Sequence, residues 1–345
     1  METILCLLHT EADGSLSRPG LEALAATRTL AEALGGAAVN VGLVGGDVRK
    51  AADGIAGCGA TRFLAVSGPD FAQSRYGSDV AGAEALCKAA GASLVIAPGT
   101  SRWARALPGA ALRLDGRVDT HACSLSAAGG AVVVGRWSYR QRIEVELSRS
   151  QRPWVILVDP GIAAAWEGAA GSASLESLPL SLPAECTRTV VSGIQAPPAD
   201  AQTIRPEAEL LLVAGAGWTK NQADGKPHVD EAQTLILGFL KRTKASLGSS
   251  KSLVDLSGEG QSVLPFLTHL HQVGQTGATP RHPKGLATCC HGEEPHTVGW
   301  RFIGERRAVN LDPGCGWARG KADVLYVADA FQVVAKVNAL LGEKP

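Results

Sequence analysis

Short apolar runs alternate with longer segments of helical periodicity from the start of the chain. The first run, Thr3–His9, is apolar without alternation, and a helical pattern at Pro19–Leu34 follows it. A strand has this unalternating pattern when both faces of its sheet are covered, as in parallel sheets. Three more strands of this kind are expected at Ala38–Val44, Thr61–Ala65 and Ser93–Ala97, with helices at Arg49–Gly57 and Ala81–Ala90. The alternation predicts βαβ units and a parallel sheet.

The pattern changes after Thr120, where apolar runs follow one another without helical segments between them. Strands are expected at His121–Leu125, Ala131–Trp137, Arg142–Leu147 and Trp154–Val158. Consecutive strands without crossover helices are typical of antiparallel pairing. We therefore expect an antiparallel extension of the first sheet and an N-terminal α/β domain over residues 1–160.

A segment rich in Ala, Ser, Pro and Gly follows this domain, over residues 161–206. Such composition without periodicity indicates a linker. One strand is expected inside it, at Thr187–Ile194, and we place the domain boundary near Pro206.

Strand and helix patterns alternate again in residues 207–345, which predicts a second, doubly wound α/β domain. Strands are expected at Glu209–Ala214, Leu253–Leu256, Gly285–Cys289, Arg307–Leu311 and Val324–Val327, and helices at Val229–Lys244, Val263–His271 and Asp329–Leu341.

The composition argues against several functional classes. The formal net charge of the 345 residues is zero, and no clustered basic footprint for nucleic acid is present. No apolar run approaches the roughly 20 residues that span a bilayer. The chain begins without a basic leader segment, and its eight cysteines are scattered without CxxC spacing. Together these features favour reduced thiols and a cytoplasmic location.

A glycine-rich turn with polar side chains lies at Gln272–Gly277, with the sequence QVGQTG. Gly274 and Gly277 allow a tight turn and a close approach of the backbone to a ligand. Gln275 and Thr276 add an amide and a hydroxyl that can donate to flavin or phosphate oxygens. On spacing alone, a glycine-rich turn with polar residues is most often an ordinary loop.

Further motifs follow this turn in a fixed order. They are His296 four residues after Gly292, Asn310-Leu311-Asp312-Pro313, and the segment Asp323–Asp329. The ordered series resembles the C-terminal, FAD-binding half of the electron transfer flavoprotein alpha subunit family, where QVGQTG, SGxxxH, NxDP and DxxxVAD occur in this order. The likeness of the first half of the chain is looser.

The resemblance implies an N-terminal Rossmann-like domain and a C-terminal FAD-binding domain. It also implies a heterodimer with a beta subunit. The FAD would take electrons from a flavoprotein dehydrogenase and pass them to a membrane quinone oxidoreductase. Such a carrier is not an enzyme, and we assign no catalytic residues and no metal ligands. The residues that the resemblance places at the cofactor are Ser250, Lys251, Val273, Gly274, Gln275, Thr276, His291, Gly292, Glu293, Glu294, Pro295, His296, Asn310, Asp329 and Ala330.

Two of these residues have specific expected roles. The segment Ser250–Asp255 resembles the family pattern SRxxVD, whose Arg lies over the flavin ring, and Lys251 replaces this Arg. Lysine keeps the positive charge that stabilises a reduced, anionic flavin but loses the planar guanidinium. The resemblance gives His296 a hydrogen bond to the flavin O2 region. The alternatives are a solvated surface lysine and an ordinary loop histidine.

The chain also departs from the family pattern. Glu293 and Glu294 replace small and apolar residues in a turn that faces the pyrophosphate in the family, and Pro295 removes a backbone donor there. Carboxylates in this turn repel a pyrophosphate unless they point away or pair with Arg301, Arg306 or Arg307. Gly217 takes the place of a family Arg. Trp218 then either stacks on adenine or belongs to the core.

Three alternatives remain open. The chain could be a flavin-free structural or regulatory subunit of a dehydrogenase complex that retains the fold. It could instead be the built-in electron exit of an associated dehydrogenase. A metal site is the third, because the side chains of Cys289, Cys290, His291, His296, Cys315 and His282 suit zinc, although their spacing does not.

Overall fold

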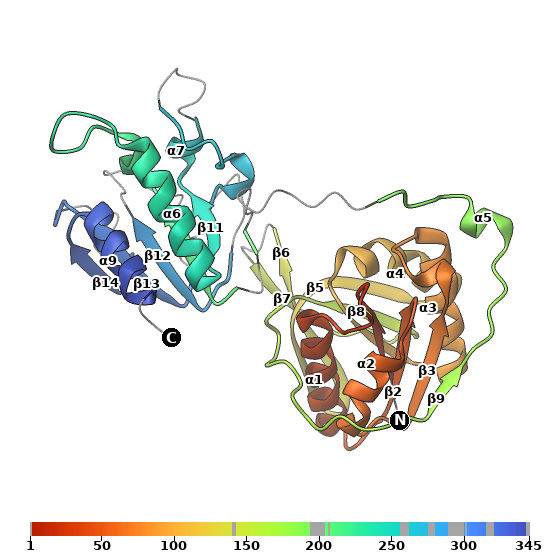
Figure 1. The fold of residues 1–345 in the computed structure, drawn as a ribbon. Helices are drawn as coiled ribbons and strands as arrows, with labels where there is room; N and C mark the ends of the chain where they lie inside the picture. The colour runs from red at the N-terminus through yellow and green to blue at the C-terminus, as the bar shows by residue number, and fades with distance from the viewer. Residues whose placement is uncertain are drawn as a thin grey trace. The chain divides into compact units, whose positions relative to one another are not determined.

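The computed structural model describes residues 2–139, 143–193, 204–205, 208–255, 262–274, 280–288, 300, 302–314 and 321–342. The chain divides into two compact units, Met1–Ile194 and Gln195–Pro345 (Figure 1). We call them unit 1 and unit 2 and describe each by itself.

Unit 1 is built on a nine-stranded sheet of order β7-β6-β5-β8-β4-β1-β2-β3-β9. All pairs from β9 to β5 are parallel, and β5-β6 and β6-β7 are antiparallel. The strands are β1 (Thr3–His9), β2 (Ala38–Gly45), β3 (Arg62–Ser67), β4 (Leu94–Pro98), β5 (Arg117–Ala128), β6 (Ala131–Ser138), β7 (Ile143–Leu147), β8 (Trp154–Val158) and β9 (Leu175–Ser177). The expected parallel sheet with an antiparallel extension is confirmed.

One strand of the expected extension is placed differently. Trp154–Val158 forms β8, which lies parallel between β4 and β5 instead of in the antiparallel part. Every residue of β8 is buried. A continuous apolar run of this kind suits a central parallel strand, and this feature outweighs the lack of a preceding helix.

Helices cover both faces of the sheet of unit 1. Leu5 and Leu7 of β1 pack with α3 (Tyr76–Ala90) and α4 (Ser101–Arg113). The alternate β1 residues pack on the opposite face, with α1 (Arg18–Ala33) and α2 (Arg49–Gly54). Helix α4 was not predicted, because Pro108 lies inside it and the Pro-Gly pair resembles a helix break.

The segment 161–193, which we call the strap, runs along unit 1 (Figure 1). It contributes β9, and the N–H of Ala173 donates to Asp53 Oδ1 at 3.0 Å. Farther along, Arg75 Nη1 donates to the Thr187 carbonyl at 3.2 Å. The strand expected at Thr187–Ile194 is wrong for the described residues, since a short helix, α5 (Ala184–Thr187), ends there and residues 188–193 form no strand.

Unit 2 contains a five-stranded, fully parallel sheet of order β11-β10-β12-β13-β14. Its strands are β10 (Leu210–Ala214), β11 (Ser246–Ser249), β12 (Lys284–Thr288), β13 (Glu305–Asn310) and β14 (Val324–Val327). Helices α6 (Val229–Thr243) and α9 (Ala330–Gly342) lie side by side on one face (Figure 1), where Asn338 Nδ2 donates to the Leu235 carbonyl. The other face packs a second apolar cluster that includes Val273, Trp300 and Ile303. The α/β class with two domains is thus confirmed.

Two expected elements of unit 2 are wrong. The residues expected as a strand from Leu253 belong to a helix, α7 (Lys251–Asp255), and the strand is Ser246–Ser249 instead. Of the helix expected at Val263–His271, only the 3₁₀ turn η5 (His269–His271) forms. Within the described part of the chain, no helix is long and apolar enough to cross a membrane.

Candidate functional site

The topology of unit 2 singles out one edge of its sheet. The chain passes from β10 outward to β11 and then returns to the other side of β10 as β12. A crevice opens at the carboxyl ends of the strands where the strand order reverses in this way, and ligands of open α/β sheets bind there. We call this the carboxyl edge of unit 2.

The described residues among the predicted cofactor residues all lie at this edge. Ser250 and Lys251 follow β11, Asn310 ends β13, and Asp329 and Ala330 follow β14. Val273 and Gly274 follow a parallel bridge between Gln272 and Ser249. The predicted residues Gln275, Thr276, His291, Gly292, Glu293, Glu294, Pro295 and His296 lie outside the described residues.

The backbone of the glycine-rich turn is tied to the end of β11. The N–H of Val273 donates to the Ser249 carbonyl at 3.0 Å. A Cβ atom at Gly248 would lie 2.6 Å from Val273 Cγ2, so the close contact requires glycine in β11. Gly274 has a φ of 139°, a backbone conformation that residues with a Cβ atom rarely adopt. Only glycine supplies this conformation without strain, which explains its place in the turn.

Lys251 presents a positive charge beside this turn. Ser250 is fully buried, and its Oγ accepts the N–H of Leu253 at 3.3 Å, which supports the first turn of α7. The Lys251 side chain is 51% exposed, and its Nζ lies 3.7 Å from Asp255 Oδ2. The ammonium is thus at the carboxyl edge and partly solvated, and its ion-pair partner among the described residues is Asp255.

Asn310 and Asp329 use their side-chain oxygens locally. Asn310 Oδ1 accepts the N–H of Asp312 at 3.1 Å, and Asp329 Oδ1 accepts the N–H of Phe331 at 2.8 Å. The second bond is an N-cap for α9, as the sequence allowed. Both side chains therefore order the backbone of this edge.

Trp218 belongs to the core. It is fully buried, and its Nε1 donates to Thr288 Oγ1 at 2.9 Å. Its ring lies 4.6 Å from that of Phe331. Because no face of this indole is exposed, the core position is correct and stacking on adenine is not.

The corresponding edge of unit 1 is filled by its own side chains. The switch point lies between β1 and β4, where His9 Nε2 bonds Thr100 Oγ1 at 2.9 Å. Burial and the nearby Arg102 lower the pKa of His9 to about 4, so the imidazole is neutral. A Cβ atom at Gly45 would lie 1.9 Å from Thr10 Oγ1, which shows how tightly this edge is packed.

A buried ion pair between α3 and α4 lies next to this edge of unit 1. Arg102 and Asp79 are almost fully buried, and Arg102 Nη2 lies 2.6 Å from Asp79 Oδ1. Arg102 Nη2 also donates to the Phe71 carbonyl at 2.7 Å. Burial raises the pKa of Asp79 although Arg102 opposes this effect. The charges of Arg102 and Asp79 thus bind groups inside unit 1 and do not face solvent.

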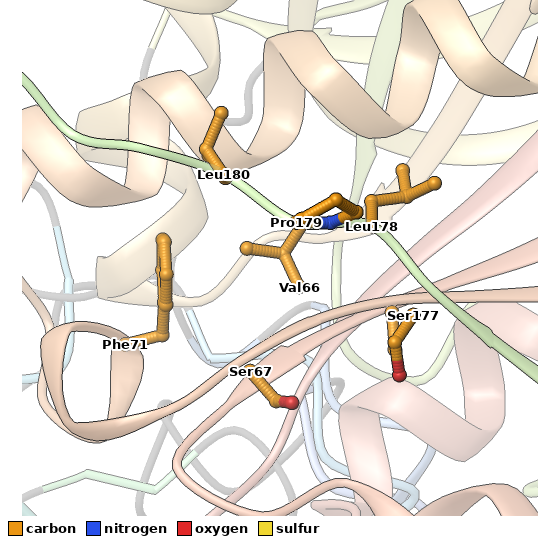
Figure 2. Close-up of a pocket in the computed structure, with 8 residues that line it drawn as sticks. Val66, Ser67, Phe71, Ser177, Leu178, Pro179 and Leu180 are labelled. Atoms are coloured by element: carbon orange, nitrogen blue, oxygen red, sulfur yellow. The ribbon is translucent and has the colours of Figure 1, made fainter.

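A cavity of about 270 Å³ lies where the strap passes the end of β3 (Figure 2). Its lining is Ala65, Val66, Ser67, Phe71, Ser177, Leu178, Pro179 and Leu180. Apart from two serine hydroxyls, these side chains are apolar, and none carries a charge. The cavity therefore offers no group that would hold an anionic cofactor, and it contains none of the predicted residues.

Sequence reasoning missed two residues next to Lys251. Asp255 Oδ1 lies 3.7 Å from His269 Nδ1, while Oδ2 faces Lys251. The spacing of four residues between Lys251 and Asp255 on α7 could have indicated the contact between these two residues. The contact between Asp255 and His269 joins separate elements and has no local sequence signal. His282, considered above for zinc, bonds the Arg205 carbonyl through Nε2 at 2.8 Å. The other residues of that hypothetical zinc site lie outside the described ranges.

Comparison with known proteins identifies the family to which the chain belongs. Residues 4–183 match the family model of the electron transfer flavoprotein domain, and the chain belongs to this family. Proteins of this family are flavin-associated electron carriers rather than enzymes, and the match suggests a heterodimer with a partner subunit. No curated protein matches the chain. The matched residues lie within unit 1, so the match does not reach the carboxyl edge of unit 2.

Proposed function

We propose that the chain is the alpha subunit of a heterodimeric electron transfer flavoprotein and holds FAD at the carboxyl edge of unit 2. In this proposal it works in the cytoplasm with a beta subunit. It accepts electrons from a flavoprotein dehydrogenase and passes them to a membrane quinone oxidoreductase. The observation that carries the proposal is the meeting of Lys251 and the Val273–Gly274 turn beside the switch point of the parallel sheet.

The described residues fit such a cofactor. Gly274 follows the approach to the end of β11 and has a positive φ that favours glycine. Because glycine has no side chain, the backbone there can come close to a ligand. The Lys251 ammonium supplies a positive charge that stabilises negative charge on a bound ring. FAD, when bound, supplies the one- and two-electron chemistry. The chain's own part is to bind it, shield it and set the charge around it.

A flavin-free structural or regulatory subunit is the second candidate. It is favoured by Gly217, which stands where the family has Arg and is buried beside the core residue Trp218. The sequence also favours this candidate, because the carboxylates of Glu293 and Glu294 would repel a pyrophosphate. The two candidates differ in one quantity, the flavin content of the complex.

The test is the flavin content of the chain co-purified with its beta-type partner. We expect about one flavin per heterodimer, by analogy with the family, and tighter FAD binding by the parent than by Lys251→Ala. Lys241→Ala is the matched control, since it removes the same charge from the exposed last turn of α6. A complex that remains colourless after incubation with FAD would exclude the carrier function and leave the structural one.

A further inference from the structure

Asp255 joins two elements at the carboxyl edge of unit 2. Its Oδ2 lies 3.7 Å from Lys251 Nζ, one turn earlier on α7, and its Oδ1 lies 3.7 Å from Nδ1 of His269 in η5. The Asp255 side chain is 35% exposed, whereas those of Lys251 and His269 are 51% and 69% exposed. One carboxylate therefore faces both the Lys251 ammonium and the His269 imidazole, which come from different segments.

The two segments also meet through the backbone. Element η5 leads directly into Gln272, which forms a parallel bridge with Ser249 at the end of β11. His271 stabilises η5, because its Nδ1 accepts the N–H of Thr268 at 3.0 Å. Burial lowers the pKa of His271, which keeps that ring neutral. Asp255 thus lies between the loop that carries Lys251 and the approach to the glycine-rich turn.

We propose that Asp255 is a positioning residue that holds the Lys251 ammonium in the ligand-free chain and sets the net charge that the site presents to an anionic ligand, with His269 as its second partner. The inference rests on the proposed function in taking FAD as that ligand. A bound pyrophosphate or reduced ring competes with Asp255 for Lys251.

The charge balance of the cluster follows from its three members. The charges of Lys251 and Asp255 cancel within their ion pair. The other oxygen of the same carboxylate faces the His269 imidazole. Among the described groups, Asp255 is the acidic partner that faces His269, and the neighbouring His271 stays neutral. Removing the Asp255 charge therefore leaves the Lys251 ammonium as a net positive charge facing an anionic ligand.

The first test is a double-mutant cycle on FAD binding by the flavin-depleted complex. Asp255→Asn should tighten FAD binding about threefold at pH 8, the scale of a half-exposed ion pair. In the Lys251→Ala background the gain should be clearly smaller, because Asp255 acts through Lys251. Unchanged or weaker binding by Asp255→Asn, or an equal gain in both backgrounds, would overturn the proposal.

A second readout does not require FAD. An ammonium held by a carboxylate is less reactive toward an amine-acylating reagent, because the reagent attacks the neutral amine. Acylation of Lys251 in the full chain, followed by mass spectrometry, should therefore be about threefold faster in Asp255→Asn, with Lys241 as the internal reference. Equal rates would overturn the role of Asp255, whereas faster acylation in a complex that binds no FAD would refute only the proposed function.

Discussion

The carboxyl edges of the two sheets differ in how they use their polar side chains. In unit 1, His9 bonds Thr100 and Arg102 pairs with Asp79, and His9, Arg102 and Asp79 are buried. In unit 2, Lys251 is half-exposed beside a glycine turn. The same topological feature thus supports stability in one unit and leaves a charged group accessible in the other. This difference is why we propose the ligand site in unit 2 and not in unit 1.

The largest expected effect concerns the buried ion pair of unit 1. Arg102→Ala leaves the Asp79 carboxylate buried without its partner, which should lower the free energy of unfolding of unit 1 by about 3–5 kcal/mol. Chemical denaturation measures this loss. Arg105→Ala, at an exposed position of the same helix, should change it by less than about 1 kcal/mol. Similar losses in both variants would mean that the edge is not held by this pair.

The neutral His9 predicts that unit 1 becomes less stable in acid. The pKa of His9 is lowered from 6.5 to about 4 in the folded chain, so below pH 6.5 the unfolded chain binds a proton that the folded chain does not. The free energy of unfolding should therefore fall as pH drops from about 6.5 to about 4. The loss from this group reaches about 3 kcal/mol and grows no further below that range.

Denaturation at several pH values tests this expectation. His9→Gln should remove this part of the pH dependence, while His121→Gln, at an exposed histidine of the same unit, should retain it. An unchanged pH profile in His9→Gln would contradict the assignment of a buried neutral imidazole.

In unit 2, Gly274→Ala tests the backbone of the turn. A φ of 139° is strained for alanine. The substitution should therefore lower the free energy of unfolding of unit 2 by about 1–3 kcal/mol, or the turn should rearrange. FAD binding should weaken accordingly in a calorimetric titration of the complex. Gly238→Ala, inside α6, is the control and should bind FAD as the parent does. Equal FAD affinity in Gly274→Ala and the parent would show that this turn does not contact the cofactor.

The smallest effect is expected for the charge of Lys251. Lys251→Ala should lower the reduction potential of the bound flavin and weaken FAD binding by about 1 kcal/mol or less, because the ammonium is partly solvated. Potentiometric titration of the parent, Lys251→Ala and Lys241→Ala compares the effect with a distant charge. A potential that falls equally in both variants would indicate a general effect of net charge.

Much of the fold could be predicted, because buried parallel strands leave a strong local signal. Thr3–His9 and Trp154–Val158 have the expected bounds. Strand Ser246–Ser249 was missed because serine and glycine are poor strand formers. It forms by parallel pairing with β10, and Gly248 allows the close approach of Val273; both are tertiary contacts.

The arrangement of the candidate site was predictable in part. The order of the motifs placed Ser250, Lys251 and Gly274 together, and the parallel topology brings them to one edge. The contact between Asp255 and His269 could not be predicted, since it depends on how η5 returns to α7. The filled edge of unit 1 was not predicted either, because the buried partners Asp79 and Arg102 belong to different helices.

The most direct test of the contrast is hydrogen–deuterium exchange on the complex with and without FAD. Binding of FAD should slow exchange at residues 250–255 and 272–274, at the carboxyl edge of unit 2. Exchange at residues 99–103, at the corresponding edge of unit 1, should remain unchanged. Protection of residues 99–103 instead, or of neither segment in a complex that retains FAD, would contradict the assignment of the cofactor to unit 2.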